Sequence, residues 1–468
     1  MKATCGILKS TKSVSIIANG SRGDIQPYIA LALALKEKYS VRILTSAEHK
    51  SFVEDFDLEH VNVWKWDNDT EEASKIGSNI RSAISHGNAK AFYGSLNELN
   101  IMNAEEFVTS TVEDLNTNRP DLLLVGSLAQ YFEFYAPLVL KIPAVRVSLQ
   151  VFGYNEDYAP LGIPTLPNGA HLDTLMEMKI QRYDGWKHFD DAAVKLGLPP
   201  LKSVLSKEDF LQEMDQTIRG SPSHKQIICQ SAIFRDILFP SAGENYIFTG
   251  PCVLDAGQQK ENNSFFGGDE TERIIDEFID RDHGRKPVYC GWGSMLAKSA
   301  EDMVEFAVRS LMICGERGIV LGGYAGLSLD TLKRSTTDEK VIAYAEEHIL
   351  FVEKVSHENL FPRVKCIVHH GGAGTTQAAL RAGVPTIITP IFLDQFDHSY
   401  VVEKLGVGFG FSQQLQQVTA ESLGEAIKSV VNDDDIALRS KEVASKICKG
   451  NGTFEARAEI DKVIENIK

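Results

Sequence analysis

The sequence has few cysteines, and none of them falls in a pattern that builds a site. The seven are scattered, odd in number and never at a metal-ligand spacing: Cys5, Cys229, Cys252, Cys290, Cys314, Cys366 and Cys448. This usage is typical of a reduced intracellular protein and unlike a disulfide scaffold or a zinc module. We expect no disulfides, no bound metal and a cytoplasmic location. Two acidic runs, residues 67–69 and 433–435, have the composition of solvated turns.

Long apolar runs and excess positive charge are also absent. No apolar stretch reaches the roughly 18 residues of a membrane span, and residues 1–11 lack the apolar core of a secretory signal. Lysine and arginine number 48 against 64 aspartates and glutamates, so the net charge is −16. This balance argues against a nucleic-acid partner and against electrostatic attachment to anionic lipid. Uncharged or lipophilic substrates are compatible with it, as is peripheral contact with a membrane.

What is present is the composition of a soluble globular protein, with 43% hydrophobic and 24% charged residues. A chain of 468 residues is long enough for roughly two or three domains. Residues 254–269 are rich in Gly, Asn, Gln and Ser and lack periodic apolar order. We therefore expect a linker there, between an N-terminal domain of residues 1–253 and a C-terminal domain of residues 270–468. The final helix, near residues 456–467, would reach back toward the first domain.

Both halves of the chain begin with the same alternation of strands and helices. In the first half, strands are expected at residues 14–18, 41–45, 121–125 and 144–149, with a helix at 27–38 that starts on Pro27. In the second half, strands are expected at 287–290, 319–322, 349–352, 366–369 and 386–389, with a helix at 301–314. Such alternation predicts two doubly wound α/β domains, whose ligands lie beyond the carboxyl ends of the strands.

The most informative stretch joins an apolar run to three glycines and then to a helix, at residues 368–376. Its glycines allow a close approach of ligand to backbone, and Thr375 or Thr376 could cap the helix. The N-terminus of a helix offers free N–H groups and a partial positive charge, which suit a phosphate. His370 adds a donor beside it. The alternative is a turn that only reverses the chain.

Polar residues stand at the ends of three other expected strands. Asp24 could accept a proton from a hydroxyl group or could simply cap a helix. Asp394 and Gln395 offer oxygen atoms for the hydroxyls of a sugar, with helix capping by Asp394 as the alternative. Ser294 could donate to a phosphate. If the two domains face each other across a cleft, Asp24 lies opposite His370, and transfer of a group from a bound nucleotide becomes the expected chemistry.

These motifs resemble those of the inverting, nucleotide-sugar-dependent glycosyltransferases with two facing Rossmann-like domains, the GT-B fold. Residues 20–27 (GSRGDIQP) are similar to the opening motif of sterol glucosyltransferases and bacterial antibiotic glycosyltransferases. Residues 369–376 resemble their donor-phosphate motif, and Asp394-Gln395 resembles their sugar-recognition pair. Residues 355–362 (VSHENLFP) are similar to the segment that carries the nucleotide base in the sterol enzymes.

The resemblance implies a role for each matching residue. Asp24 would be the general base, with Ser21 and Arg22 bordering the donor phosphates or the acceptor. Val355 and His357 would lie at the base, and Asp394 and Gln395 would hold the hexose. The pyrophosphate would be held by five residues of the glycine-rich stretch: His370, Gly372, Ala373, Gly374 and Thr375.

The reaction that the resemblance implies is transfer of glucose from UDP-glucose, as co-substrate and without metal or other cofactor, to a lipophilic alcohol with inversion. A sterol or a hydroxylated fatty acid is the expected acceptor, and another small alcohol or phenol is the alternative. Four aromatic residues are candidates for its pocket, with core packing as the other interpretation: Phe132, Phe134, Phe152 and Tyr154.

Two other classes of protein compete with this interpretation. Gly372-Ala373-Gly374 after a strand, with Asp394 about 20 residues on, is also the pattern of an NAD-dependent oxidoreductase. That fingerprint fails at Gln377, where it requires its third glycine. A non-catalytic nucleotide-binding protein would keep the same motifs.

Overall fold

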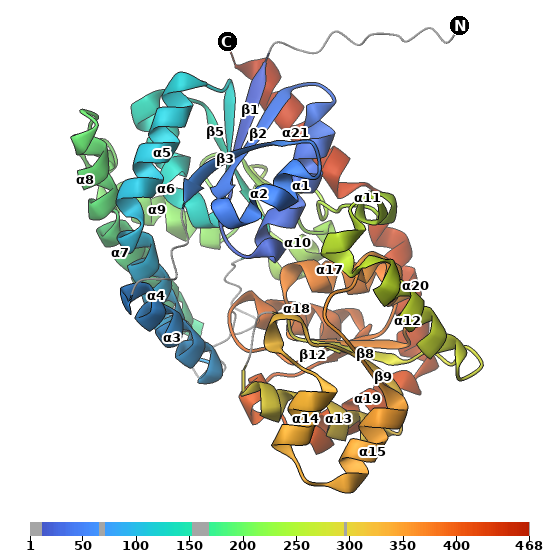
Figure 1. Ribbon diagram of the computed structural model, residues 1–468. Helices are drawn as coiled ribbons and strands as arrows, with labels where there is room; N and C mark the ends of the chain where they lie inside the picture. The colour runs from blue at the N-terminus through green and yellow to red at the C-terminus, as the bar shows by residue number, and fades with distance from the viewer. Residues whose placement is uncertain (1–11, 65–70, 152–167, 294–296, 468) are drawn as a thin grey trace, which may run out of the picture.

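A computed structural model describes residues 12–64, 71–151, 168–293 and 297–467 of the chain. Two parallel sheets form two domains, the first drawn in blue to green and the second in yellow to orange in Figure 1. Each sheet is covered by helices on both faces, which is the arrangement that parallel strands require because both of their faces are apolar. The predicted class, two doubly wound α/β domains, is confirmed.

The first sheet has seven strands in the order β3-β2-β1-β4-β5-β6-β7. The neighbouring strands are all parallel. Their bounds are β1 Ser13–Ile17, β2 Ser40–Ser46, β3 Glu59–Trp64, β4 Leu122–Gly126, β5 Ala144–Ser148, β6 Gln226–Ile228 and β7 Tyr246–Phe248. The helices of this half are α1 Arg22–Lys36, α2 Lys50–Glu54, α3 Glu71–Ser85, α4 Ala89–Met102, α5 Ala104–Thr117, α6 Gln130–Tyr135, α7 Asn168–Gly185, α8 Lys187–Lys195, α9 Lys207–Ile218 and α10 Ala232–Leu238.

The second sheet has six parallel strands in the order β10-β9-β8-β11-β12-β13. Their bounds are β8 Val288–Gly291, β9 Gly318–Leu321, β10 Ile349–Val352, β11 Cys366–His369, β12 Thr386–Ile388 and β13 Gly408–Gly410. The helices are α11 Ala256–Glu261, α12 Gly268–Asp280, α13 Ala300–Cys314, α14 Leu329–Ser335, α15 Glu339–His348, α16 His357–Leu360, α17 Ala373–Ala382, α18 Asp394–Leu405, α19 Ala420–Val431, α20 Asp434–Ile447 and α21 Gly452–Asn466. Strands β10 and β11 have the predicted bounds.

Helix α1 begins five residues before the predicted start at Pro27. Ser21 is its N-cap, and the Asp24 carboxylate accepts from the Ser21 backbone N–H at 2.9 Å, which satisfies one of the free donors at the helix end. Pro27 therefore lies inside the helix, where its missing N–H removes one backbone bond. The prediction of a loop up to residue 26 was wrong because this short capping motif outweighs the signal from proline.

The segment expected to be an irregular linker, residues 254–269, folds into α11, a short 3-10 turn at Asn263–Phe266 and the start of α12. Asp255 caps α11 by accepting from Gln258 N at 2.8 Å. Phe265 then packs against Phe52 of the first domain, with the ring centroids 4.9 Å apart. Aromatic contacts thus hold the segment in place. The prediction missed them because the surrounding residues are mostly polar.

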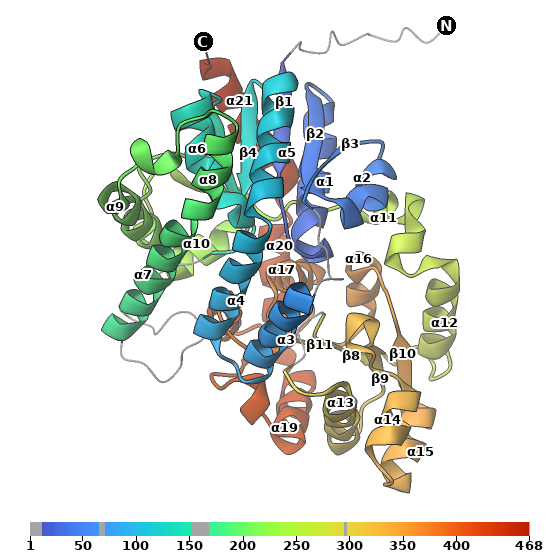
Figure 2. The ribbon, with the colours of Figure 1, turned by 60° about the vertical axis from the view of Figure 1, so that its left-hand side comes forward.

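The final helix, α21, packs on the first domain (Figure 1). Its buried residues Ala456, Ile460 and Ile464 share a core with β1 and α1, and the Arg457 guanidinium donates to Ala34 O at 3.1 Å. A second connection runs through the turn between α3 and α4, which reaches down to the second domain in Figure 2. There the Gln414 amide donates to Gly87 O at 2.8 Å. Besides the connecting segment, the domains therefore contact each other at two separate places.

In the part of the chain that the structure describes, no helix combines the length and apolarity needed to cross a bilayer.

Candidate functional site

Asp24 lies at the carboxyl end of β1, in the first turn of α1. Its Oδ2 accepts from Ser21 Oγ at 2.9 Å and its Oδ1 accepts from Gln150 Nε2 at 3.2 Å. Burial raises the pKa of Asp24, against the lowering effect of the bonds from Ser21 and Gln150. Ser21 and not Asp24 is therefore the N-cap of α1, contrary to the capping alternative, and Asp24 is the third residue of the capping motif. Its carboxylate is half-buried and hydrogen-bonded, at the end of the sheet where ligands bind in doubly wound domains.

Gly20 makes this position of Asp24 accessible. The backbone at Gly20 has a φ of +124°, and a Cβ there would lie 2.6 Å from Asp24 Oδ2. Any side chain would displace the carboxylate. Next to this turn His49 contacts Gly20 O through Nε2 at 2.9 Å, and its charge favours the ionised form of Asp24.

The glycine-rich stretch forms a tight turn between β11 and α17. Gly371 has a φ of +91°, and its N–H donates to His369 Nδ1 at 3.0 Å. A Cβ on Gly371 would lie 2.8 Å from Ile388 Cγ2. Helix α17 begins at Ala373 with Gly372 as its N-cap, so neither Thr375 nor Thr376 caps it, contrary to the expectation. Thr376 Oγ1 instead donates to Gly372 O at 2.9 Å, and the first N–H groups of the helix have no side-chain cap.

His370 stands between two glycine turns. Its ring lies within van der Waals distance of an added Cβ on Gly293, at 3.5 Å, and within 2.7 Å of one on Gly372. Its Nδ1 is buried without a hydrogen-bond partner. Burial, together with the charges of His398 and His357, lowers the pKa of His370 to about 4. At neutral pH His370 therefore offers an uncharged ring with one N–H donor and one acceptor nitrogen.

Asp394 occupies the first turn of α18 and is buried. Leu393, with a φ of +63°, is the N-cap of that helix, so Asp394 is not the cap. Burial raises the pKa of Asp394 from 3.8 to about 7, and the charge of Asp24 adds to this shift. A carboxylate of the first domain thus contributes to the electrostatic environment of a carboxyl group in the second.

Gln395 is folded inward, with little exposed surface. Its Oε1 accepts from the backbone N–H groups of Ile391 at 2.8 Å and Phe392 at 3.3 Å. The amide oxygen that the sequence offered to a sugar hydroxyl is therefore occupied by the loop, and the Nε2 group is what Gln395 has to offer a ligand.

Arg22 and His357 lie on a common rim between the domains. The Arg22 guanidinium donates to Phe265 O and lies over the Phe266 ring, 4.6 Å from its centroid. His357 stacks on Phe361 with centroids 4.4 Å apart, and its Nε2 lies 3.2 Å from the Tyr289 hydroxyl. Burial and the charge of Arg22 lower the pKa of His357 to about 4. Val355, two residues earlier, is half-buried beside this rim.

Two of the aromatic residues expected in the acceptor pocket pack elsewhere. Phe132 has no exposed surface and meets Phe107 edge to face at 5.3 Å, while Phe134 meets Phe210 at 5.7 Å. Both belong to the core beneath α5 and α9 rather than to a pocket wall. Phe152, Tyr154 and Ser294 lie outside the described residues.

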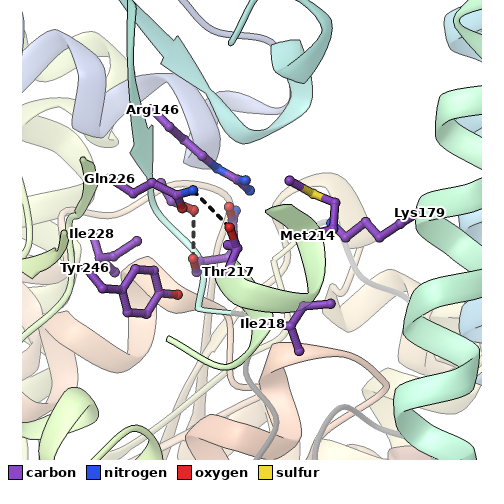
Figure 3. A pocket seen from close by; sticks show the side chains of 10 residues that line it. Arg146, Lys179, Met214, Thr217, Ile218, Gln226, Ile228 and Tyr246 are labelled. Atoms are coloured by element: carbon purple, nitrogen blue, oxygen red, sulfur yellow. Dashed lines mark hydrogen bonds between the residues drawn. The ribbon is translucent and has the colours of Figure 1, made fainter. Parts of the chain in front are cut away.

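The structure adds residues that sequence reasoning missed. A pocket in the first domain is lined by Arg146, Lys179, Met214 and Tyr246, and it opens beside Gln150, the partner of Asp24 (Figure 3). One signal for it was available, because Arg146 interrupts the otherwise apolar strand β5. Lys179 lies on helix α7, where its sequence neighbours give no such indication.

The acidic run at residues 433–435 is a helix end, where Asp433 accepts from Ile436 N at 3.0 Å. Among the described residues no group of three or more His, Cys, Asp and Glu side chains is arranged to hold a metal ion. The other run, residues 67–69, lies outside the described residues.

Sequence comparison links both halves of the chain to known families. Residues 14–98 match the glycosyltransferase family 28 N-terminal domain, and residues 334–463 match the C-terminal domain of erythromycin biosynthesis protein CIII-like proteins. A sterol 3-beta-glucosyltransferase of Vanderwaltozyma polyspora is 29% identical over 93% of this chain, and one of Saccharomyces cerevisiae is 28% identical over 98%. The chain spans about a third of the length of these relatives, 33% and 36%.

Solved structures match the whole fold. The glycosyltransferase of kitacinnamycin superposes with a TM-score of 0.65 at 16% identity, covering 97% of this chain and 99% of that one. CalG4, the calicheamicin glycosyltransferase, gives 0.62 at 15% identity, with 98% and 99% covered. The resemblance to sterol glucosyltransferases in sequence and to antibiotic glycosyltransferases in fold is confirmed, and the two-domain arrangement is the GT-B fold.

Proposed function

We propose that this chain, related in sequence to sterol glucosyltransferases and built on the GT-B fold, transfers glucose from UDP-glucose to the hydroxyl of a lipophilic acceptor with inversion. The observation that carries the proposal is that the glycine turn of the second domain lies against the end of the first sheet. The His398 ring contacts Gly371 O and lies 3.4 Å from the Gln230 amide. Gln230 in turn donates to Leu149 O at 2.8 Å, next to Gln150, the partner of Asp24. Asp24 and Asp394 are close enough that the charge of one raises the pKa of the other. If the donor diphosphate binds at the N-terminus of α17, Asp394 is available to the hydroxyls of the hexose. Asp24 is then available to the attacking hydroxyl group of the acceptor.

In the proposed reaction, Asp24 takes the proton of the acceptor hydroxyl as that oxygen attacks the anomeric carbon of glucose. The bond from the anomeric carbon to the diphosphate oxygen breaks, and its electron pair leaves with UDP. Attack from the side opposite the leaving group converts an α-linked donor into a β-glucoside. The bond from Gln150 holds Asp24 in place for this step.

Charge that develops on UDP would be stabilised by groups that are already in position. The free N–H groups at the start of α17 and the uncharged His370 ring both lie at the glycine turn. Each such donor contributes on the order of a hundredfold in rate when it meets the charge of the transition state. Residues 372–375 would hold the pyrophosphate, Val355 and His357 the base, and Asp394 with the Gln395 amide the glucose. No metal or other cofactor is needed in this scheme.

A neutral sterol and a hydroxylated fatty acid are the two acceptor classes that we consider. The test is incubation of the purified protein with UDP-glucose and a panel of sterols and hydroxy fatty acids, with products detected by mass and the anomeric configuration read by NMR. A β-glucoside of one class supports the proposal. No product with any lipophilic acceptor, or binding of NADH without binding of UDP in a titration, would overturn it.

A further inference from the structure

Helices α3 and α4 form a hairpin (residues 71–102) that belongs to the first domain and packs into the core of the second. Figure 2 shows its turn reaching down to the second domain. Ile84 and Ala89, on the two sides of that turn, are buried in the apolar cluster that includes Phe392. Phe92 of α4 adds a direct contact to Phe392, with the ring centroids 4.8 Å apart. The hairpin is therefore packed against the loop that leads from β12 to α18, two residues before Asp394.

Gln414 connects the turn of the hairpin to that loop by hydrogen bonds. Its amide nitrogen donates to Gly87 O, in the turn, at 2.8 Å and to Ile391 O, in the loop, at 3.0 Å. Both donors of one amide group are thus used, one on each domain. Gly87 permits this approach, since its φ is +60° and a Cβ there would lie 2.2 Å from Gln414 Nε2.

Ile391 is held through both of its backbone polar groups. Its C=O accepts from Gln414, and its N–H donates to Gln395 Oε1 at 2.8 Å. Gln395 is the buried residue whose Nε2 group is proposed to face the glucose. Between the two residues the backbone passes through Leu393 at a φ of +63°, a conformation that persists only where neighbouring contacts fix it. The orientation of the Gln395 amide therefore depends on the bond from Gln414 to Ile391.

We infer that the α3–α4 hairpin is a positioning element for the hexose site, and that Gln414 is the residue through which it acts. The inference rests on the proposed function, since that proposal assigns Asp394 and Gln395 to the glucose. Gln414 touches no substrate in this scheme and works through the Ile391 backbone. The first domain thus completes the site for the sugar of the donor, whereas the second domain alone forms the turn before α17 that would hold the diphosphate.

Gln414→Met tests this role because methionine has a similar length but donates no hydrogen bond. The matched control is Gln416→Met. The Gln416 amide donates to Ile84 O at 2.7 Å, in the same hairpin, and its oxygen has no hydrogen-bond partner among the described residues. The measured quantities are the affinities for UDP-glucose and for UDP, by calorimetric titration without acceptor. Since UDP lacks the hexose, the ratio of the two affinities isolates the hexose site.

We expect Gln414→Met to bind UDP-glucose at least about fivefold more weakly than the wild-type protein, the effect of one lost hydrogen bond. Its affinity for UDP should stay within about twofold of wild type. A change that only loosened the fold would weaken both ligands, so the ratio separates positioning from a merely structural role. Gln416→Met should keep the wild-type ratio. An unchanged ratio in Gln414→Met, or equal weakening of both ligands, would overturn the inference.

Gly87→Ala breaks the same connection from the first domain. Its Cβ would displace the Gln414 amide without any change to the second domain, so the same selective loss of UDP-glucose affinity is expected. Gly197→Ala is the control, because Gly197 has a φ of +77° and a Cβ there meets none of the described residues within 4 Å. Adding Gly87→Ala to Gln414→Met should weaken UDP-glucose binding by less than about twofold more, since both changes remove one contact. Fully additive losses would overturn the assignment to Gln414.

The two ligands also separate this inference from the proposed function. A protein that binds neither UDP nor UDP-glucose would overturn both. Selective loss of UDP-glucose affinity in Gln414→Met, in a protein that transfers glucose to no acceptor, would keep the role of the hairpin and reject the transfer. Formation of a β-glucoside by the wild-type protein, with an unchanged affinity ratio in Gln414→Met and Gly87→Ala, would keep the transfer and reject the role of the hairpin.

Discussion

Where the two domains face each other, they carry different kinds of polar group. On the C-terminal side the turn after β11 presents backbone N–H groups and His370, and burial lowers the pKa of His370 to about 4, so that this ring is uncharged at neutral pH. On the N-terminal side the polar groups are ionisable side chains: Asp24 at the end of β1, and Arg146 with Lys179 in the pocket behind Gln150. The glycine turn is thus built from main chain and a neutral ring, and the end of the first sheet carries ionisable side chains.

This difference follows from what each side is proposed to hold. A nucleotide diphosphate carries its own negative charge. A site made of backbone N–H groups and neutral side chains can bind it, and no unbalanced charge is left in the protein when the site is empty. The acceptor side must remove a proton and select one alcohol among many, which requires ionised groups of specific type. The comparison can therefore be tested by removing charge from one side and donors from the other.

The largest effect is expected at Asp24. Asp24→Asn keeps an oxygen that can accept from Ser21 but cannot take a proton, so transfer should fall by about a thousandfold. Binding of UDP, on the other side of the cleft, should stay within about twofold of wild type. Steady-state transfer and calorimetric titration with UDP measure the two quantities. Asp55→Asn, at an exposed aspartate, is the matched control, and transfer within tenfold of wild type in Asp24→Asn would show that Asp24 is not the base.

The next effect is expected at the glycine turn. Gly371→Ala introduces a Cβ 2.8 Å from Ile388 and 3.1 Å from Gln395 O, at a φ of +91°. The strain, roughly 1–3 kcal/mol, should reshape the turn and weaken UDP binding by at least about tenfold. Gly77→Ala in α3 meets only Arg81 at 3.6 Å and should leave UDP binding unchanged. Equal UDP affinities of the two variants would show that the turn does not form the phosphate site.

A somewhat smaller effect is expected from replacing the neutral imidazole ring of His370. His370→Leu removes an uncharged donor beside the leaving group, so kcat should fall by roughly 10- to 100-fold. Since the loss concerns a hydrogen bond and not a charge, His370→Asn should recover part of the rate. Initial rates at saturating UDP-glucose measure this, with His188→Leu, at an exposed position of α8, as control. Full activity of His370→Leu would mean that the helix N-terminus alone stabilises the charge of the leaving group.

The smallest effect is a change in stability at Asp394. Its folded pKa, about 7, lies above the ordinary value of 3.8, so the folded state binds the proton more tightly. Wild-type stability should therefore fall as the pH rises from about 4 to above 7, by up to about 4 kcal/mol at 1.36 kcal/mol per pKa unit. Asp394→Asn removes this loss, so its thermal midpoint should exceed that of wild type by a few degrees at pH 8.

At pH 4 most of the difference between the two midpoints should vanish, because Asp394 is then protonated in the folded chain and pH 4 is already close to the ordinary pKa of 3.8 that applies in the unfolded chain. Thermal unfolding followed by circular dichroism at the two pH values measures the difference. The exposed Asp435→Asn should show no such dependence. A midpoint of Asp394→Asn below that of wild type at pH 8 would mean that the carboxylate stabilises the fold through a contact of its own.

The second sheet and its glycine turn were largely predictable because their signals are contiguous. Strands β10 and β11 have the predicted bounds, and a glycine turn between a strand and a helix has few other meanings. The start of α1 was misjudged, because the bond from Ser21 to Asp24 outweighs the proline rule. Phe132 and Phe134 were expected in a pocket and lie in the core, since an aromatic residue has the same sequence signature in both places.

The sequence by itself determined the α/β class, the position of the glycine turn and the candidate base at Asp24. Those features depend on residues within a few positions of one another, where local sterics and hydrogen bonding decide the conformation. Only the tertiary structure placed Gln150 against Asp24, occupied the Gln395 oxygen with backbone N–H groups and set Arg146 and Lys179 around one pocket. Charge and burial act through space, so these relations depend on packing between elements that the sequence keeps far apart.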